Sequence, residues 1–115
     1  MSSITRSLAL AALAFATGAL AAPRAQSALE CGVAADMAVV AHSLAREEIQ
    51  RSKADTIMAR IYDVTDSDRG KELMKDILDA AYVSNGGSAQ RFAEDLFATC
   101  MKTGGDMDTV LGKKL

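Results

Sequence analysis

The chain has 115 residues and a formal net charge of −2, and charged residues make up 24% of it. This length fits one small domain with a modest hydrophobic core. Lysine and arginine are interspersed with aspartate and glutamate, so the sequence lacks the basic stripe that nucleic acid or an anionic membrane surface would select. We therefore expect no nucleic-acid partner.

The N-terminal segment predicts export. Residues 1–6 carry one positive charge, and residues 7–20 form an uncharged run that is rich in alanine and leucine. A membrane-spanning helix needs roughly 20 strongly apolar residues, and this run is shorter and mostly alanine. The pattern therefore favours a signal peptide over residues 1–21 instead of a membrane anchor.

Small residues mark where this leader would be removed. Ala19 and Ala21 occupy positions −3 and −1 of a cleavage site after Ala21. Cleavage after Ser27, with Ala25 at position −3, is the alternative. The mature chain is then expected in the periplasm or outside the cell, without membrane contact, and with a flexible start over residues 22–28.

Two cysteines, Cys31 and Cys100, remain after this cleavage. In an oxidising compartment an even number of cysteines indicates disulfides, and two allow only one intramolecular pair. Closing a loop of about 70 residues should stabilise the fold by ~4 kcal/mol on the chain-entropy model. Neither a CxxC redox pair nor four zinc ligands are present, so we predict a structural Cys31–Cys100 disulfide.

The rest of the chain is typical of helices, since good helix formers dominate and the single proline is Pro23. Amphipathic segments are expected over residues 29–48, 53–62, 71–83 and 89–103. Short connections make neighbouring helices antiparallel, which brings Cys31 and Cys100 to the same end. The prediction is an all-α fold, a small antiparallel four-helix bundle over 29–103, followed by a short polar tail over 104–115.

The last of these segments has the clearest helical pattern. Its apolar residues recur at helical spacing: Ala89, Phe92, Ala93, Leu96, Phe97, Cys100 and Met101. Ser88 is expected to cap this helix, and Asn85-Gly86-Gly87 to end the helix before it. In the second segment, Ser52 and Asp55 resemble a capping box. The pattern also predicts near-complete burial of Phe97.

The first segment carries two stripes. One contains mostly larger apolar residues: Val33, Met37, Val40, Ala41 and Leu44. The other consists of the alanines Ala34, Ala38 and Ala45, against which a second helix could pack closely. Three neighbouring helices offer limited cover for both stripes, so Ala34, Ala38 and Ala45 are predicted to form an interaction face.

Candidate chemistry is sparse. A calcium loop starting at Asp63 would have Asp68 in place of the required glycine and Met74 in place of the required glutamate. His42 is the only histidine and has no acid or nucleophile at helical spacing. The methionines are spread over the helices, which favours a role in the core over copper binding. We expect no catalytic residues, no cofactor and no metal ligands.

The mature chain resembles a loose group of small, uncharacterised bacterial periplasmic proteins with signal peptides and two cysteines. The resemblance rests on Cys31 opening an alanine-rich helix, on Arg46-Glu47, on Ala80-Ala81-Tyr82, and on Phe92-Ala93 ahead of Cys100. It differs at Ile49, where a glycine is expected in the turn. The resemblance implies a periplasmic helical fold and implies no activity.

Without a chemical site, the expected function is binding. A small disulfide-linked helical module would recognise an envelope protein or a second copy of itself, as an inhibitor, a chaperone or an accessory protein. The alternative is a helical protein that binds a small molecule or a metal in its core. An enzyme is not expected, because the sequence lacks a nucleophile elbow and a phosphate-binding glycine loop.

Overall fold

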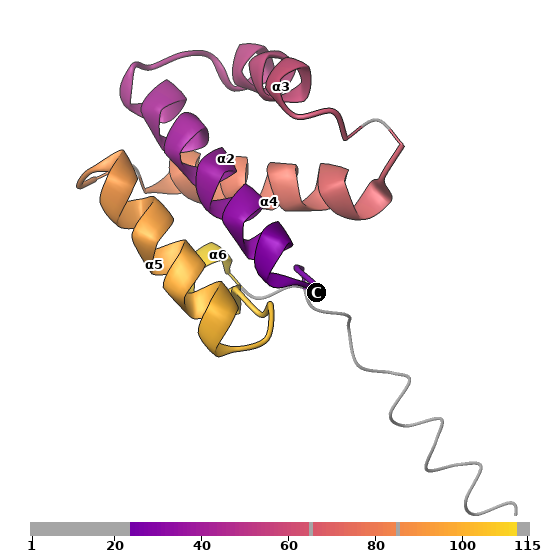
Figure 1. Ribbon diagram of the computed structural model, residues 1–115. Coiled ribbons are helices and arrows are strands. Elements are labelled where there is room, and N and C mark those ends of the chain that lie inside the picture. Colours follow the sequence, from indigo (N-terminus) through magenta and orange to yellow (C-terminus); the bar gives the residue numbers. More distant parts are fainter. Residues whose placement is uncertain (1–23, 65, 85, 113–115) are drawn as a thin grey trace, which may run out of the picture.

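A computed structural model describes residues 24–64, 66–84 and 86–112, and the regular structure of these residues is entirely α-helical (Figure 1). The helices are α2 (Ala28–Arg46), α3 (Arg51–Ile61), α4 (Asp68–Val83), α5 (Ala89–Lys102) and the short α6 (Asp108–Leu111). The predicted all-α fold is therefore confirmed. The predicted signal peptide, residues 1–21, lies outside the described residues.

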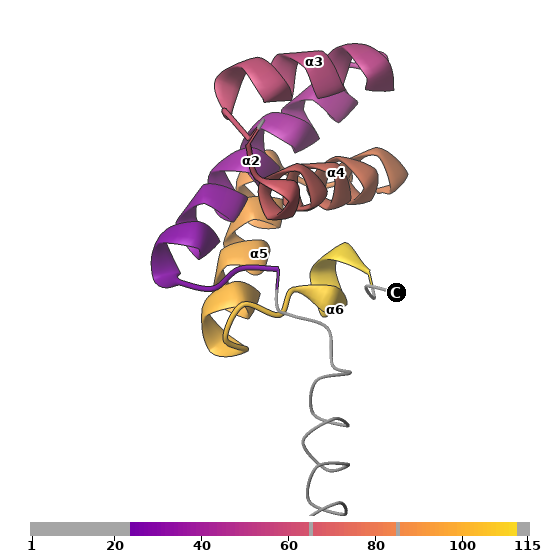
Figure 2. The same cartoon turned by 90° about the vertical axis from the view of Figure 1, so that its right-hand side faces the viewer.

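Helix α2 is the centre of the bundle. It packs most extensively against α5 and α4, whereas α3 makes smaller contacts with α2 and α4. The views in Figures 1 and 2 show α2 and α5 side by side, with α4 crossing α2. Helix α6, which the sequence interpretation assigned to a polar tail, packs against α4 and α5.

Serine residues start three of the helices. The hydroxyl groups of Ser27, Ser67 and Ser88 accept hydrogen bonds from the backbone N–H groups of Glu30, Gly70 and Arg91, respectively. Each bond satisfies one of the N–H groups that the first helical turn leaves unpaired. The cap at Ser88 is thus confirmed. The expected cap at Ser52 is wrong, because α3 already begins at Arg51, after a Gln50 that makes no side-chain cap.

The end of α2 explains why no glycine is needed at Ile49. Glu48, one residue earlier, adopts the left-handed conformation with φ of 59°. The N–H of Glu48 donates to the carbonyl of Ala45, and the N–H of Ile49 donates to the carbonyl of Leu44. This pair of bonds is the Schellman motif that closes many helices. Here a glutamate occupies the position that glycine usually fills.

The core is built from medium-sized side chains with few aromatic rings. The largest fully buried apolar side chains are Met37, Met58, Ile77, Leu78, Leu96 and Met107. Alanines of α2 fill the narrow space where this helix meets its neighbours. Close-packed interiors depend on such complementary volumes, so small residues on the central helix allow two other helices to approach it.

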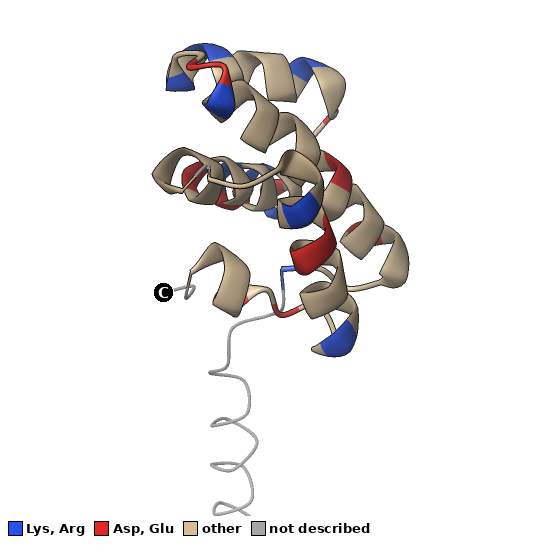
Figure 3. Ribbon diagram, turned by 90° about the vertical axis from the view of Figure 1, so that its left-hand side faces the viewer, with Lys and Arg blue, Asp and Glu red and all other residues tan. Residues whose placement is uncertain are grey.

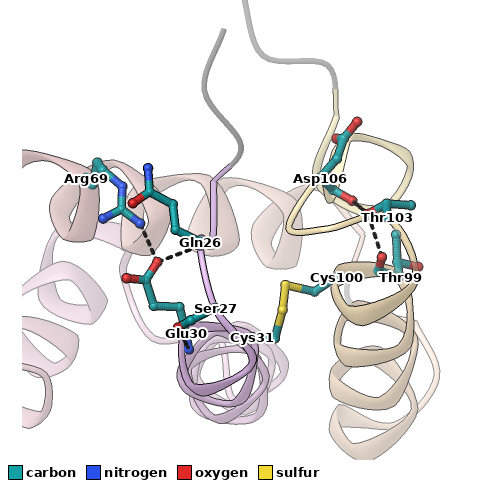
Figure 4. Close-up of a disulfide and its surroundings, with 9 residues drawn as sticks. All are labelled: Gln26, Ser27, Glu30, Cys31, Arg69, Thr99, Cys100, Thr103 and Asp106. Carbon is teal, nitrogen blue, oxygen red and sulfur yellow. Dashed lines mark hydrogen bonds and ion pairs between the residues drawn. A yellow bond between two sulfur atoms is a disulfide. The ribbon is translucent and has the colours of Figure 1, made fainter.

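The disulfide joins α2 to α5. Cys31 lies in the first turn of α2 and Cys100 near the end of α5, and their Cα atoms are 5.6 Å apart (Figure 4). The two helices are therefore antiparallel at this contact. Both cysteines are buried, and no described cysteine is free. The predicted pairing is confirmed.

The two ends of the described chain are fastened to each other, in contrast to the expected flexible start and polar tail. Arg24 and Ala25 are buried, and the Ala25 N–H donates to the Gly105 carbonyl at 3.3 Å. Met107 is fully buried and precedes α6. The contacts join residues about 80 positions apart, which local sequence patterns do not reveal.

Helix α2 is long and apolar enough to cross a membrane, and among the described helices it is the single one with these properties. These properties also occur in core helices of soluble proteins. In this structure seven residues of α2 are buried against the rest of the chain.

Candidate interaction surface

The predicted interaction face is part of the core. Ala34 and Ala38 are fully buried and Ala45 is 4% exposed, so none of the three presents a surface to a partner. The prediction is wrong because α2 lies at the centre of the bundle, where α5 and α4 cover two of its sides. These three alanines therefore pack the interior of the domain.

The predicted near-complete burial of Phe97 is also wrong. Phe97 is 40% exposed, whereas its neighbour Leu96 is fully buried. The seven apolar positions of α5 span more of the helix circumference than one core can cover. Three residues turn inward, Ala93, Leu96 and Cys100, and Phe97 is left on the outer edge of this stripe.

Phe97 lines an open groove between α2 and α5. The groove has a volume of about 420 Å³. Its lining comes from α2 (Gly32, Ala35, Asp36 and Val39) and from α5 (Gln90, Ala93, Glu94 and Phe97). Val39 is 40% exposed, like Phe97. The lining thus combines three small residues, Gly32, Ala35 and Ala93, with apolar side chains from both helices, Val39 and Phe97.

The charged residues that line this groove are all acidic. Two of its eight lining residues, Asp36 and Glu94, are acidic, and none is basic. The Tyr62 hydroxyl donates to Asp36 Oδ2 at 2.5 Å, which positions this carboxylate. Burial, together with this bond and the charge of Asp36, raises the pKa of Tyr62. The Glu94 carboxylate accepts a bond from the Gln90 amide on the same helix.

Further apolar surface continues from the groove. Met101 lies four residues after Phe97, one helical turn along the same side of α5, and is 48% exposed. Elsewhere charged residues of both signs are interspersed over the ribbon (Figure 3). Apolar surface of this kind, bordered by polar residues, is typical of interaction sites.

His42 is buried in the bundle. Its Nε2 lies 3.3 Å from the Gly86 carbonyl, and its ring stands against Phe92 with centroids 5.6 Å apart. Its Nδ1 has no hydrogen-bond partner among the described residues. This arrangement makes His42 a packing residue that joins α2 to the start of α5.

A cavity of about 240 Å³ brings His42, Ser88 and Asp95 to one lining, the three residue types of a hydrolase triad. Their polar atoms are engaged separately. The Ser88 hydroxyl caps α5 through Arg91, and Asp95 faces the Arg91 guanidinium at 3.5 Å. No hydrogen bond between any two of the three residues is found within the described part of the chain, so the geometry required between nucleophile and base is not formed.

Among the described residues no group of three or more His, Cys, Asp or Glu side chains is placed to hold a metal ion. In the 63–68 turn, Ser67 caps α4 and Asp68 lies in its first turn, where a negative charge is favourable. A smaller cleft of about 230 Å³ near this turn contains the Arg69–Glu30 ion pair, so its charges are already matched within the chain.

The chain matches no protein-family model, and it is similar to no curated protein and to no solved structure. The resemblance to small periplasmic proteins with two cysteines stays a prediction.

The groove residues carried a signal that the sequence interpretation did not use. Asp36 and Val39 on α2 and Gln90, Glu94 and Phe97 on α5 recur every three or four positions, as residues on one side of a helix do. Each set combines one apolar residue with acidic or amide residues. Such mixed sides resemble ordinary solvent-facing sides, and only the pairing of α2 with α5 makes them into one groove.

Proposed function

We propose that this chain is an exported, non-catalytic protein-binding module. In this proposal the α2/α5 groove binds an amphipathic helix of another envelope protein, and this helix carries lysine or arginine beside its apolar side. The observation that supports the proposal is the groove itself, which combines exposed Val39 and Phe97 with two acidic residues and no basic one.

A helix is the occupant that fits this shape. The groove runs between two antiparallel helices that lie side by side (Figure 1). Insertion of the apolar side of a helix into a groove between helices is a common mode of peptide recognition. Phe97 is the type of residue that contributes strongly to binding, because aromatic side chains bury a large area with little loss of conformational freedom.

Charge selects a basic partner over a second copy of the chain. In a symmetric dimer through this groove the same surface would meet itself, so Asp36 and Glu94 would approach the equivalent carboxylates. Like charges brought together at an interface are unfavourable. A partner helix with lysine or arginine at the matching positions would instead pair with both carboxylates.

Export supports a partner in the cell envelope. The Cys31–Cys100 disulfide fits an oxidising compartment, and the apolar N-terminal segment fits a leader. In this proposal the mature protein is periplasmic or secreted and is not inserted in the membrane. An inhibitor, a chaperone or an assembly accessory would each use such a groove, and the identity of the bound helix distinguishes these roles.

Site-specific photo-crosslinking in the native compartment tests the proposal. A photoreactive phenylalanine analogue is placed at position 97 in the groove, and the matched control carries it at Arg60, an exposed residue of α3. We expect a crosslink from position 97 and none from position 60. The crosslinked partner peptide should lie in an amphipathic helix that contains lysine or arginine.

A charge reversal in the groove provides a second test of the proposal. Glu94 is exposed, so reversing its charge in Glu94→Lys should reduce the crosslink from position 97 while the melting temperature stays unchanged. A crosslink to a second copy of this chain, an equal yield from position 60, or a partner peptide without basic residues would contradict the proposal.

A further inference from the structure

We propose that Met101 is the methionine at which a peroxide oxidises the folded protein, and that its sulfoxide makes the surface beside the α2/α5 groove polar without unfolding the domain. The position of the reactive sulfur follows from burial and does not depend on what the groove binds. The effect on binding, which is argued last, rests on the proposed function.

Met101 differs from the other described methionines in its exposure. It is 48% exposed near the end of α5, whereas Met37, Met58 and Met107 are at most 1% exposed. Met74 is partly buried against the core. The core role that the sequence favours for the methionines therefore does not hold for Met101. An oxidant in solution reaches an exposed sulfur directly, but it reaches a buried sulfur only after local opening of the fold.

Cysteine does not compete with Met101 for the oxidant. A thiolate is usually the first group that a peroxide attacks. Cys31 and Cys100 form a buried disulfide, so neither offers a thiolate (Figure 4). The sequence also contains no tryptophan. The thioether of Met101 is thus the most accessible group that a mild oxidant converts.

The reaction needs only this thioether and hydrogen peroxide. A lone pair of Met101 Sδ attacks one peroxide oxygen, so that an S–O bond forms and the O–O bond breaks. The other oxygen leaves as hydroxide, takes the proton of the transferred oxygen and becomes water. The sulfur is oxidised and the peroxide is reduced by the same electron pair. The product is a methionine sulfoxide, which methionine sulfoxide reductases return to the thioether.

The sulfoxide lies beside the groove. Met101 follows Phe97 by one helical turn, so the two residues are neighbours on the same side of α5. Oxidation converts a flexible apolar side chain into a polar one. Apolar surface next to Phe97 is thereby replaced by polar surface. The buried methionines keep their thioethers, so the core and the fold are unchanged.

Peptide mapping tests the site. The purified, disulfide-bonded protein is exposed to hydrogen peroxide, and each methionine is followed by digestion and mass spectrometry. Met101 should take up oxygen at least about tenfold faster than Met37, Met58 and Met107, because a buried sulfur reacts only after local opening. In denaturant the rates should become similar. A rate for any of these three residues, or for Met74, that equals or exceeds the rate for Met101 in the folded protein would overturn the proposal.

Two variants test the change in surface polarity. Met101→Leu keeps an apolar side chain without the sulfur, and Met74→Leu is the matched control on α4. After treatment with peroxide, wild type and Met74→Leu should elute earlier from a hydrophobic-interaction column at an unchanged melting temperature. Met101→Leu should elute as it does before treatment. An equal shift in Met101→Leu, or a wild-type protein that loses its fold as Met101 is oxidised, would contradict the proposal.

Under the proposed function, oxidation of Met101 weakens the binding of a helix in the groove. The measured quantity is the Kd of the crosslinked partner helix, as a peptide, before and after treatment with peroxide. For wild type this Kd should rise at least about fivefold, because the bound helix removes water from the sulfoxide, whereas for Met101→Leu it should stay constant. An unchanged Kd for the oxidised wild type would contradict this regulation. Absence of any crosslinked helix would instead contradict the proposed function, since the mapping of the oxidised methionine needs no partner.

Discussion

Arg24 and Asp108 lie 84 positions apart in the sequence, and their side chains meet at 2.6 Å. The same guanidinium group also bonds Asp76, so one buried cation connects the beginning of the described chain, α4 and α6. A buried charge is tolerated when its partners match it, and its loss leaves those partners uncompensated. The two ends of the domain therefore depend on each other.

Replacement of Arg24 by methionine should lower the free energy of unfolding by about 2 kcal/mol, the scale of a lost hydrogen bond to a charged group in a partly buried setting. Methionine keeps much of the apolar stem but leaves Asp76 and Asp108 without their cation. Chemical denaturation measures the effect. Arg60→Met, at an exposed position of α3, is the control and should have almost no effect. Equal stability of the two variants would show that the Arg24 contacts contribute nothing.

Adjacent residues of α5 should respond differently to truncation. Leu96→Ala should cost roughly 2–5 kcal/mol, because Leu96 is fully buried and its loss leaves a cavity. Phe97→Ala should cost less, since Phe97 is 40% exposed. Urea denaturation of both variants gives the comparison. A larger loss for Phe97→Ala than for Leu96→Ala would mean that Phe97 lies in the core.

Removal of the disulfide should destabilise the domain strongly. The bond closes a loop with a sequence separation of 69, for which the chain-entropy model gives ~4 kcal/mol. The double variant Cys31→Ser/Cys100→Ser should therefore unfold at much lower denaturant concentration than the oxidised protein. Added reductant should shift the wild-type midpoint toward that of the double variant and leave the variant unchanged. A wild-type midpoint that does not respond to complete reduction would contradict this.

Tyr62 should make the protein sensitive to alkaline pH. Its pKa is raised above the value of about 10 in an unfolded chain, mainly by burial and then by the bond to Asp36. The fold thus favours the protonated hydroxyl. This stabilisation is present below pH ~10 and is lost as the pH rises above that value. Between about pH 8 and about pH 11, a range that brackets the pKa of an unfolded tyrosine, wild type should therefore lose more stability than Tyr62→Phe. Parallel losses in the two proteins would refute this role of Tyr62.

Part of the fold could be predicted because it depends on local patterns. Helical spacing of apolar residues located the four longer helices to within a few residues, and Ser88 was recognisable as a cap. The disulfide was predictable because two cysteines can form only one intramolecular pair. Short loops then placed Cys31 and Cys100 at the same end of the bundle.

Other features depend on the number and placement of neighbouring helices, which spacing does not report. The stripe of Ala34, Ala38 and Ala45 could be recognised in the sequence. The sequence did not show that α2 lies at the centre of the bundle and is covered on two sides. The pattern of α5 likewise showed an apolar side without showing that Phe97 lies at its exposed edge. Arg24 could not be assigned at all, because its partners are distant in sequence.

Binding of a basic amphipathic helix in the α2/α5 groove is tested most directly by measuring the Kd of the crosslinked partner helix, as a peptide, for wild type, Phe97→Asp and Val83→Asp. Val83 is 87% exposed on α4 and lies outside the groove, so Val83→Asp adds the same charge as a control. We predict that Phe97→Asp raises the Kd at least about tenfold, the loss of 1.4 kcal/mol or more expected for a central aromatic residue. Val83→Asp should bind like wild type, and all three proteins should have similar melting temperatures. A folded Phe97→Asp protein that binds the peptide as tightly as wild type would contradict binding in the groove.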